Sequence, residues 1–332
     1  MLRPFCEIRI GENKFNFVTE AEFESSWKLL TDRGTIRLPH RFLKENKVIF
    51  VGENNFFKKG DLVTVDAGYF PEKFRLFTGF VSGINPSIPV EIAVEDYAYV
   101  IKQTNLTFSF KSVSLIQLLN SAIEEAKKKA SGYVLEGLKN IEVRAIDADL
   151  GAFRVTNVNI ANILQELKKT YALTSYFRGN ILYVGLAYYE EGTKRATFEF
   201  QKNIIDQGTD LEYVKEDDIS FKVKAVSMLE NNTKIEVEVG DDNGEQRTIT
   251  KYNLNKEELI RAANREMNRL RFEGFRGQIN TFLEPAVYHG DEIEIIDKKT
   301  PERNGIYLTE SVNYTIGVNG YFQSIKLGAK VG

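Results

Sequence analysis

The sequence is poor in the residues that build cross-linked or metal-bound sites. Cys6 is its only cysteine, and His40 and His289 are its only histidines, among 332 residues. One cysteine excludes an intramolecular disulfide framework and any centre held by several cysteines, and two histidines exclude a histidine-rich metal site. We therefore expect no metal ion and no other cofactor, and we expect Cys6 to be buried as a small core residue.

A basic charge balance is also missing. The chain has 44 Lys and Arg residues against 47 Asp and Glu residues, so its formal net charge is −3. Proteins that bind nucleic acids mainly by neutralising phosphates are usually basic. The charge balance therefore argues against a nucleic-acid-binding protein of that kind.

No apolar stretch is long enough to cross a bilayer. The longest, at 181–189, is about half the length that a spanning helix needs. Residues 1–10 contain no apolar core of a signal peptide, so we expect synthesis in the cytoplasm and no membrane contact. Proline is scarce, with seven residues, whereas apolar residues make up 42% of the chain and aromatic residues 12%, which is enough for packed cores.

The order of the predicted elements places a helical region between two β regions. Residues 1–106 contain short strand-like runs at roughly ten-residue spacing, which is typical of a β-sandwich or barrel. Residues 107–190 predict two helices and a hairpin, which form a small α/β insert. Strands return at 191–332, where one helix is expected near 255–271. The predicted fold class is mainly β with an α/β insert, in about three domains.

A short repeat connects the two β regions. Gly60-Asp61 and Gly290-Asp291 each precede an alternating strand that ends at an aspartate. Turns of this kind are common, so one interpretation is coincidence. The other interpretation is a pair of related β-barrels in one chain. It predicts a positive φ at both glycines and comparable damage from Gly60→Val and Gly290→Val.

No catalytic motif is present. The chain contains no Gly-x-Gly-x-x-Gly, no Walker A sequence and no His-Glu-x-x-His. A Ser-His-Asp triad would need His40 or His289, and both are expected to be exposed turn residues. We therefore expect that the protein is not an enzyme.

Several short motifs resemble those of phage baseplate hub proteins, the family that also resembles the hub part of type VI secretion spikes. They follow the same order along nearly the whole chain, although each is short and mostly structural. The matching segments are SSWKLLTD (25–32), IRLP (36–39), FKKGD (57–61), FTGFV (77–81), VEDY (94–97), TFLEP (281–285), HGD (289–291), PERNG (301–305) and GYFQSI (320–325).

This resemblance implies the structural hub of a contractile tail, in a phage, a prophage or a related injection machine. Such a chain carries two similar tail-tube-like barrels, and three chains form a ring of six barrels. The ring joins a sixfold tail tube to a trimeric spike and forms part of the passage for DNA, which it does not bind specifically. The expected location is the tail baseplate of the virion.

One strand of the second β region is a candidate for the wall of that passage. Glu236 and Glu238 alternate with Ile235, Val237 and Val239, so the two sets must lie on opposite faces of a strand. We expect the apolar set to face the barrel interior. The glutamates would then face either the lumen, where they would repel DNA phosphates, or the exterior, and our hypothesis is the lumen.

Two other functions remain open at this stage. A tail-associated peptidoglycan or polysaccharide hydrolase could use Glu284, an acid flanked by apolar residues. No partner carboxylate for Glu284 can be chosen from the sequence. A host-binding adhesin could use the 15 tyrosines, but these are spread along the chain without a clustered aromatic platform.

Overall fold

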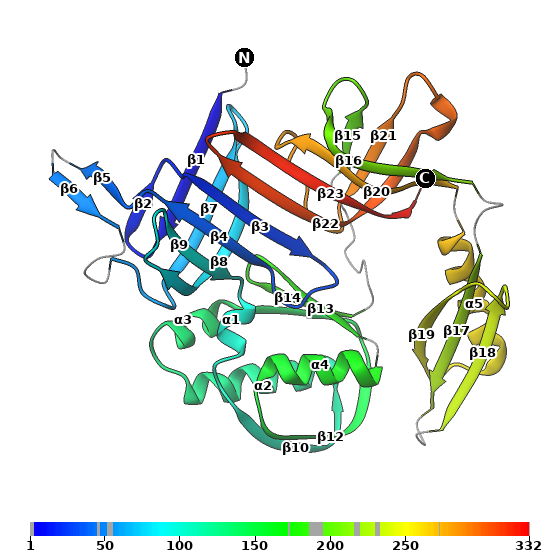
Figure 1. The fold of residues 1–332 in the computed structure, drawn as a ribbon. Coiled ribbons are helices and arrows are strands. Elements are labelled where there is room, and N and C mark those ends of the chain that lie inside the picture. The colour runs from blue at the N-terminus through cyan, green and yellow to red at the C-terminus, as the bar shows by residue number, and fades with distance from the viewer. Residues whose placement is uncertain are drawn as a thin grey trace.

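In a computed structural model, the protein is a mainly β molecule in which most helices lie together on one side and the last helix lies apart, against a small separate sheet (Figure 1). The predicted fold class, mainly β with an α/β insert, is confirmed. No helix of the described residues is long and apolar enough to span a membrane. The structure describes residues 3–44, 47–51, 56–171, 173–185, 195–215, 220–229, 233–271 and 273–331.

The first β half consists of the strands up to residue 95. Their side chains alternate between the core and solvent, and in the last strand Val90, Ile92 and Val94 are buried while the intervening residues are half-exposed. The strands are β1 (Pro4–Ile10), β2 (Asn13–Phe15), β3 (Glu20–Ser26), β4 (Arg33–Leu38), β5 (Arg41–Lys44), β6 (Lys47–Phe50), β7 (Leu62–Tyr69), β8 (Phe74–Asn85) and β9 (Val90–Glu95).

The α/β insert follows β9 and has its own hydrophobic core. Ser114 caps its longest helix, because the Ser114 side chain accepts a hydrogen bond from the Gln117 N–H. The elements of the insert are α1 (Ala98–Ile101), β10 (Leu106–Ser114), α2 (Leu115–Lys129), α3 (Gly132–Asn140), β11 (Glu142–Ala145), β12 (Asp149–Val158), α4 (Ile160–Tyr171), β13 (Thr174–Arg178) and β14 (Ile181–Gly185). The expected boundary at 190/191 lies outside the described residues.

The second β half is built from β15 (Arg195–Glu199), β16 (Ile204–Val214), β20 (Gly274–Phe282), β21 (Glu292–Ile296), β22 (Gly305–Gly317) and β23 (Gly320–Lys330), with a short 3-10 helix, η2 (Pro301–Arg303), before β22. It shares one hydrophobic core with the first half. The two halves are therefore packed together, whereas the insert and the segment described next have separate cores.

A small module interrupts the second half between β16 and β20. Its described residues form a three-stranded sheet of β17 (Phe221–Met228), β18 (Lys234–Gly240) and β19 (Glu245–Tyr252), covered by α5 (Lys256–Leu270). The expectation that Val237 and its apolar neighbours face a barrel interior is wrong, because Val237 is buried with Leu259 and Ala263 of α5 in the core of this module. The segment 191–332, expected as one domain, thus contains two cores.

The two β halves have the same topology. Each half contains five strands that we number 1 to 5 in chain order, and in both halves their order across the sheet is 3-4-5-2-1. This order is β7-β8-β9-β4-β3 in the first half and β21-β22-β23-β20-β16 in the second. The register shifts at the same place in both, between Val81 and Gly83 in β8 and between Thr309 and Ser311 in β22. Shared strand order and a shared β-bulge indicate an internal duplication.

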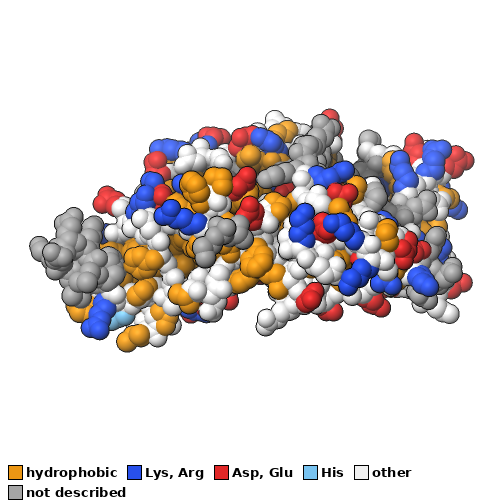
Figure 2. Space-filling view, turned by 90° about the horizontal axis from the view of Figure 1, so that it is seen from above, with side chains coloured by type: hydrophobic (Ala, Val, Ile, Leu, Met, Phe, Trp, Pro, Cys, Tyr) orange, Lys and Arg blue, Asp and Glu red, His pale blue; other side chains and the backbone are white. Residues whose placement is uncertain are grey.

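The halves are joined edge to edge. Strand β3 pairs with β22, from Glu20 opposite Gly317 to Ser26 opposite Ser311. Within the described residues this pairing creates a single 13-stranded sheet that runs through both halves (Figure 1). Seen from above, basic and acidic side chains are intermixed over the surface (Figure 2), in line with the small net charge.

Candidate functional surface

The two predicted Gly-Asp turns have the same backbone geometry. Gly60 has φ +87° and Gly290 has φ +85°. The Gly60 N–H donates to the Val81 carbonyl at 2.8 Å, and the Gly290 N–H donates to the Thr309 carbonyl at 2.8 Å. Since only glycine adopts such a φ without strain, both turns require the residue that the repeat supplies.

The two aspartates close their turns in the same way. The Asp61 N–H donates to the Lys58 carbonyl and the Asp291 N–H to the Tyr288 carbonyl, both at 3.1 Å. In return, Asp61 Oδ2 accepts from the Lys58 N–H at 2.8 Å, and Asp291 Oδ2 accepts from the Tyr288 N–H at 2.9 Å. These matching bonds align the halves residue by residue.

The α/β insert contacts both turns. The ring of Tyr133, in α3, lies over Gly60. At the other turn Arg178, in β13, donates to the His289 carbonyl at 2.5 Å and to Asp291 Oδ1 at 3.2 Å. The insert therefore bridges the two equivalent positions of the duplicated halves.

His289 is buried, so the expectation of an exposed turn histidine is wrong for it. The insert covers the turn, with the Tyr176 ring edge-on to the imidazole at a centroid distance of 4.9 Å. Burial and the nearby Arg178 charge lower the pKa of His289 to about 3. The imidazole is therefore neutral at physiological pH.

We expect Gly60→Val to destabilise the fold more than Gly290→Val, instead of equally. Both substitutions strain a positive φ, at about 1–2 kcal/mol. A Cβ at Gly60 would also lie 2.5 Å from the Tyr133 ring, whereas at Gly290 the nearest atom is Arg178 Nη2 at 3.8 Å. The measurement is the free energy of unfolding in urea. In a Tyr133→Ala background the difference should disappear, and equal losses in the wild-type background would contradict the steric argument.

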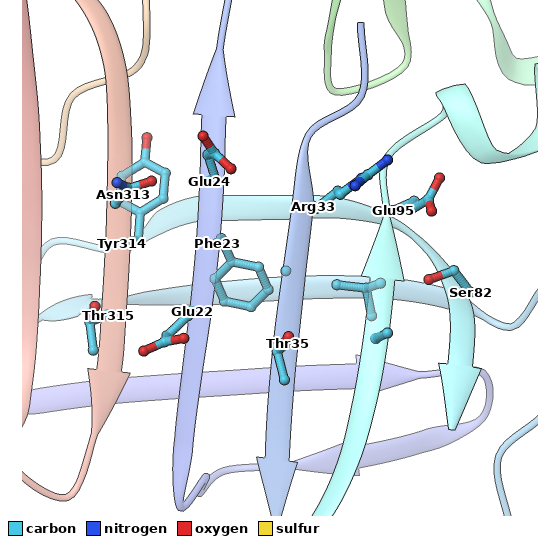
Figure 3. A pocket seen from close by; sticks show the side chains of 13 residues that line it. Glu22, Phe23, Glu24, Arg33, Thr35, Ser82, Glu95, Asn313, Tyr314 and Thr315 are labelled. Atoms are coloured by element: carbon cyan, nitrogen blue, oxygen red, sulfur yellow. The ribbon is translucent and has the colours of Figure 1, made fainter. Parts of the chain in front are cut away.

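The continuous sheet has one polar face across the junction of the halves. Because side chains alternate along each strand, the neighbours of these polar residues, such as Phe23, Ile36 and Ile92, point into the shared core. A groove of about 650 Å³ runs over this face (Figure 3). The polar face comprises Glu20, Glu22, Glu24, Arg33, Thr35, Arg37, Glu91, Ala93, Glu95, Asn313 and Thr315.

The polar face is acidic. Arg37 is paired with Glu20 Oε2 at 2.5 Å and with Glu91 Oε2 at 3.3 Å. On β3, β4 and β9 there are five glutamates and two arginines, and Lys102 pairs with Glu95 at 2.6 Å, so an excess of two negative charges is left. Exposed ion pairs of this kind contribute little stability.

Part of this face is repeated in the second half, and the sequence analysis missed it. Arg33-Gly34 in β4 corresponds to Arg276-Gly277 in β20, and each arginine lies opposite a glutamate of the first strand, Glu24 or Glu212. The available signal was the pattern Arg-Gly-x-Ile at 33–36 and 276–279. It is too short to stand out without the topology.

The glycines of this pattern allow a close approach of neighbouring strands. A Cβ on Gly34 would lie 2.8 Å from the Glu22 carbonyl oxygen and would overlap the Phe23 ring. A Cβ on Gly277 would overlap the Asp210 carbonyl oxygen. Both halves therefore need glycine at this position for the same steric reason.

Glu236 and Glu238 lie elsewhere. They belong to β18 of the module, where Glu236 pairs with Lys224 and Glu238 with Lys222, both at 2.7 Å. The structure does not bring them to the Gly-Asp turns or to the polar face. A lumen exists only in an assembly, so their lumen placement stays a prediction.

The residues considered for chemistry form no common site. Glu284 follows β20, and its charge contributes, after burial, to the raised pKa of Tyr69. Cys6 is buried as predicted, and burial raises the pKa of its thiol to about 12. Among the described residues, no group of His, Cys, Asp and Glu side chains is arranged to hold a metal ion.

Comparison with known proteins identifies the fold. No protein-family model and no curated protein matches the sequence. Among solved structures, a tail protein from Neisseria meningitidis MC58 matches with a TM-score of 0.64 and 14% identity, over 99% of this chain and 97% of the other. The 43 kDa tail protein of prophage MuSo2 from Shewanella oneidensis matches with a TM-score of 0.61 and 14% identity, over 97% of each chain.

A further match is to a component of a secretion system. An Escherichia coli component of the type VI secretion system, described as similar to the T4 tail proteins gp27 and gp5, matches with a TM-score of 0.55 and 8% identity, over 97% of this chain and 76% of the other. The predicted resemblance to tail hub proteins is thus confirmed for the fold. Over nearly its whole length, this chain has the fold of phage tail proteins and of a type VI secretion component.

Proposed function

We propose that the protein is a structural, non-enzymatic hub of a contractile tail baseplate, which joins a sixfold tail tube to a trimeric spike. The observation that carries this proposal is the duplicated five-strand topology, with its two copies joined edge to edge. Two equivalent units per chain give a threefold assembly an approximate sixfold symmetry. A protein that connects a sixfold tube to a threefold spike needs this combination of threefold and approximate sixfold symmetry.

The free edges of the sheet support a closed ring. Strand β3 pairs with the last residues of β22, and by equivalence β16 should pair with the last residues of β8. Among the described residues, β16 pairs only with β20, and the pairing of β7 with β8 ends at Phe80. Each chain therefore presents the two complementary edges of one contact at opposite ends. Repetition of such a head-to-tail contact closes a ring when the rotation permits.

Three chains in this ring would place six halves around a central passage. We propose that the polar face of the continuous sheet lines it, since that face joins the two halves and is acidic. Negative side chains repel DNA phosphates over about 8 Å at physiological ionic strength. DNA would then pass without being bound, and the hub would reside in the tail of the particle.

A pair of engineered cysteines tests the ring. Val81 and Thr309 accept equivalent bonds, so Asn85 and Asn313, four residues later, are equivalent positions. Asn313 lies opposite Glu24, and therefore Asn85 should lie opposite Glu212 of the next chain. In a Cys6→Ala background, Asn85→Cys with Glu212→Cys should give covalent trimers on a non-reducing gel, because paired strands hold Cα atoms within disulfide range.

The matched control is Glu24→Cys with Asn313→Cys, which should form a disulfide within one chain. If the control closes while the first pair leaves only monomers in particles and in concentrated solution, the ring contact is wrong. The non-enzymatic part is tested with labelled cell-wall material. Turnover that Glu284→Gln abolishes would favour the hydrolase instead.

A further inference from the structure

Two aliphatic side chains are exposed to an unusual degree. Ile88 and Val318 are each 81% exposed, and the next large apolar residue among those described, Phe70, is 62% exposed. An aliphatic side chain in water contributes nothing to folding. Isolated cases need no explanation, but these two occupy related positions.

Ile88 and Val318 lie at equivalent hairpin tips. Ile88 is in the turn between β8 and β9, and Val318 is in the turn between β22 and β23, which join the fourth and fifth strands of their halves. The turn sequences otherwise differ: residues 86–89 read Pro-Ser-Ile-Pro, and residues 318–319 read Val-Asn. Only the exposed aliphatic side chain is common to both.

Both tips project from the same end of the sheet. Each successive pairing from β22 through β3, β4 and β9 to β8 is antiparallel, so β22 and β8 run in the same direction and end at the same side. In the proposed ring, three chains would therefore present six aliphatic tips on one rim. The turn between β3 and β4 lies at the opposite end of the sheet, and its exposed apolar residue is Leu29.

We propose that these six tips form the docking surface for a protein ring of sixfold symmetry, with one apolar socket per subunit. This inference rests on the hub proposed above and assigns the end that receives the tail tube. One small aliphatic side chain would bind its socket weakly. Six such side chains on one ring would bind together, and the affinity of the linked contacts exceeds that of any single contact. The tips therefore provide a contact that only a matching sixfold ring can use fully.

A threefold partner would use this rim differently. Ile88 itself, with Pro39, His40, Arg41, Phe50 and Pro89, lines an apolar groove, and Val318 is not among the residues that line it. A partner with three copies would be free to engage that groove and ignore Val318. A sixfold partner meets Ile88 and Val318 as equivalent contacts, so the two residues should matter to a similar extent.

The test uses the full chain and rings of the tail tube protein encoded with it, mixed and analysed by sedimentation. Ile88→Asp and Val318→Asp should each weaken tube binding at least about tenfold and by similar factors, and the double variant should abolish it. Leu29→Asp, at the opposite end, should bind as the wild type does. All variants should remain trimeric, because the tips take no part in the strand pairing.

The outcomes separate this inference from the proposed function. A wild-type chain that never forms trimers, in the tail or alone, overturns both. Trimers whose tube binding is unchanged in the double variant, or is lost only in Ile88→Asp, overturn the docking surface and leave the hub intact. Similar losses in both single variants, with Leu29→Asp unaffected, support it.

Discussion

Gly277→Ala is expected to lower the free energy of unfolding by about 3 kcal/mol or more. Gly277 has φ +113°, a conformation that costs an L-residue about 1–3 kcal/mol. The added methyl group would also overlap the backbone oxygen of Asp210 in the neighbouring strand. Backbone cannot rotate away as a side chain can, so β16 and β20 would have to separate.

Urea denaturation of the purified chain measures this loss. The matched control is Gly83→Ala, a strand glycine whose added Cβ would meet only the Ala93 side chain at 3.6 Å. That variant should stay within about 0.5 kcal/mol of the wild type. A Gly277→Ala protein as stable as the control would show that β16 does not need the close approach. The position of β16, the edge strand in the proposed ring contact, would then not depend on Gly277.

The second large effect concerns a buried pair of carboxylates. Asp32, between β3 and β4, and Asp96, after β9, are linked through the backbone: the Asp32 N–H donates to Asp96 Oδ2 at 3.0 Å, and the Asp96 N–H donates to the Asp32 carbonyl at 3.1 Å. Burial, and then the charge of Asp96, raise the pKa of Asp32 well above its ordinary value. Burial raises the pKa of Asp96 to about 7, against the opposing effects of the hydrogen bonds from the Asp32 and Ala98 N–H groups and of the Lys102 charge.

We therefore expect this pair to contribute a stability that falls as the pH rises from about 4 to about 7, opposite in sign to the contribution of His289, whose lowered pKa makes stability rise up to about pH 6.5. In this range the folded protein retains a proton that the unfolded chain, with an ordinary Asp pKa of 3.8, has released. When the folded state binds one proton more than the unfolded state, the free energy of unfolding falls by about 1.4 kcal/mol for each pH unit. Over this range, the contribution of the pair therefore falls by a few kcal/mol.

Asp32→Asn should make the slope of stability against pH more positive than in the wild type, because it removes a carboxyl whose raised pKa makes stability fall. The amide can still accept from the Ser26 N–H and can donate to the Ser25 hydroxyl, so the turn is preserved while one of the two charges is removed. The measurement is the free energy of unfolding at pH 5 and pH 8. Glu22→Gln, on the exposed polar face, should keep the wild-type slope. Parallel curves for the wild type and Asp32→Asn would show that the pair does not hold the proton.

Much of the local structure could be predicted from residues that are neighbours in the chain. Ser114 begins a helix because its hydroxyl caps a free N–H, and Asn255 does the same in a capping box with Glu258. The Gly-Asp turns were predictable because positive φ and an aspartate that accepts from the backbone are properties of the turn itself. Caps and turns of this kind are formed by residues close in the sequence, so the sequence predicts them directly.

Functional inference depended on pairings between distant residues. Nothing near Glu20–Ser26 in the sequence announces that β3 pairs with β22, about 290 residues away, yet this pairing joins the halves and creates the polar face. The Arg-Gly repeat became visible only after the shared strand order had aligned β4 with β20. Three residues of similarity carry too little information to be separated from chance.

The sequence by itself determined the fold class, the two Gly-Asp turns, the helices α2, α4 and α5, and the absence of catalytic motifs, because alternation, capping and turn chemistry act over a few residues. The prediction of two helices and a hairpin for the insert was incomplete, since it missed α3 and the strands β10, β11 and β12. Only the tertiary structure decided that His289 is buried, that Val237 packs on α5 in a separate module, and that Ile88 and Val318 are equivalent. Burial depends on which surface an element meets, and that surface comes from another part of the chain. The same alternating strand can line a barrel or cover a helix, and its own residues do not distinguish the two.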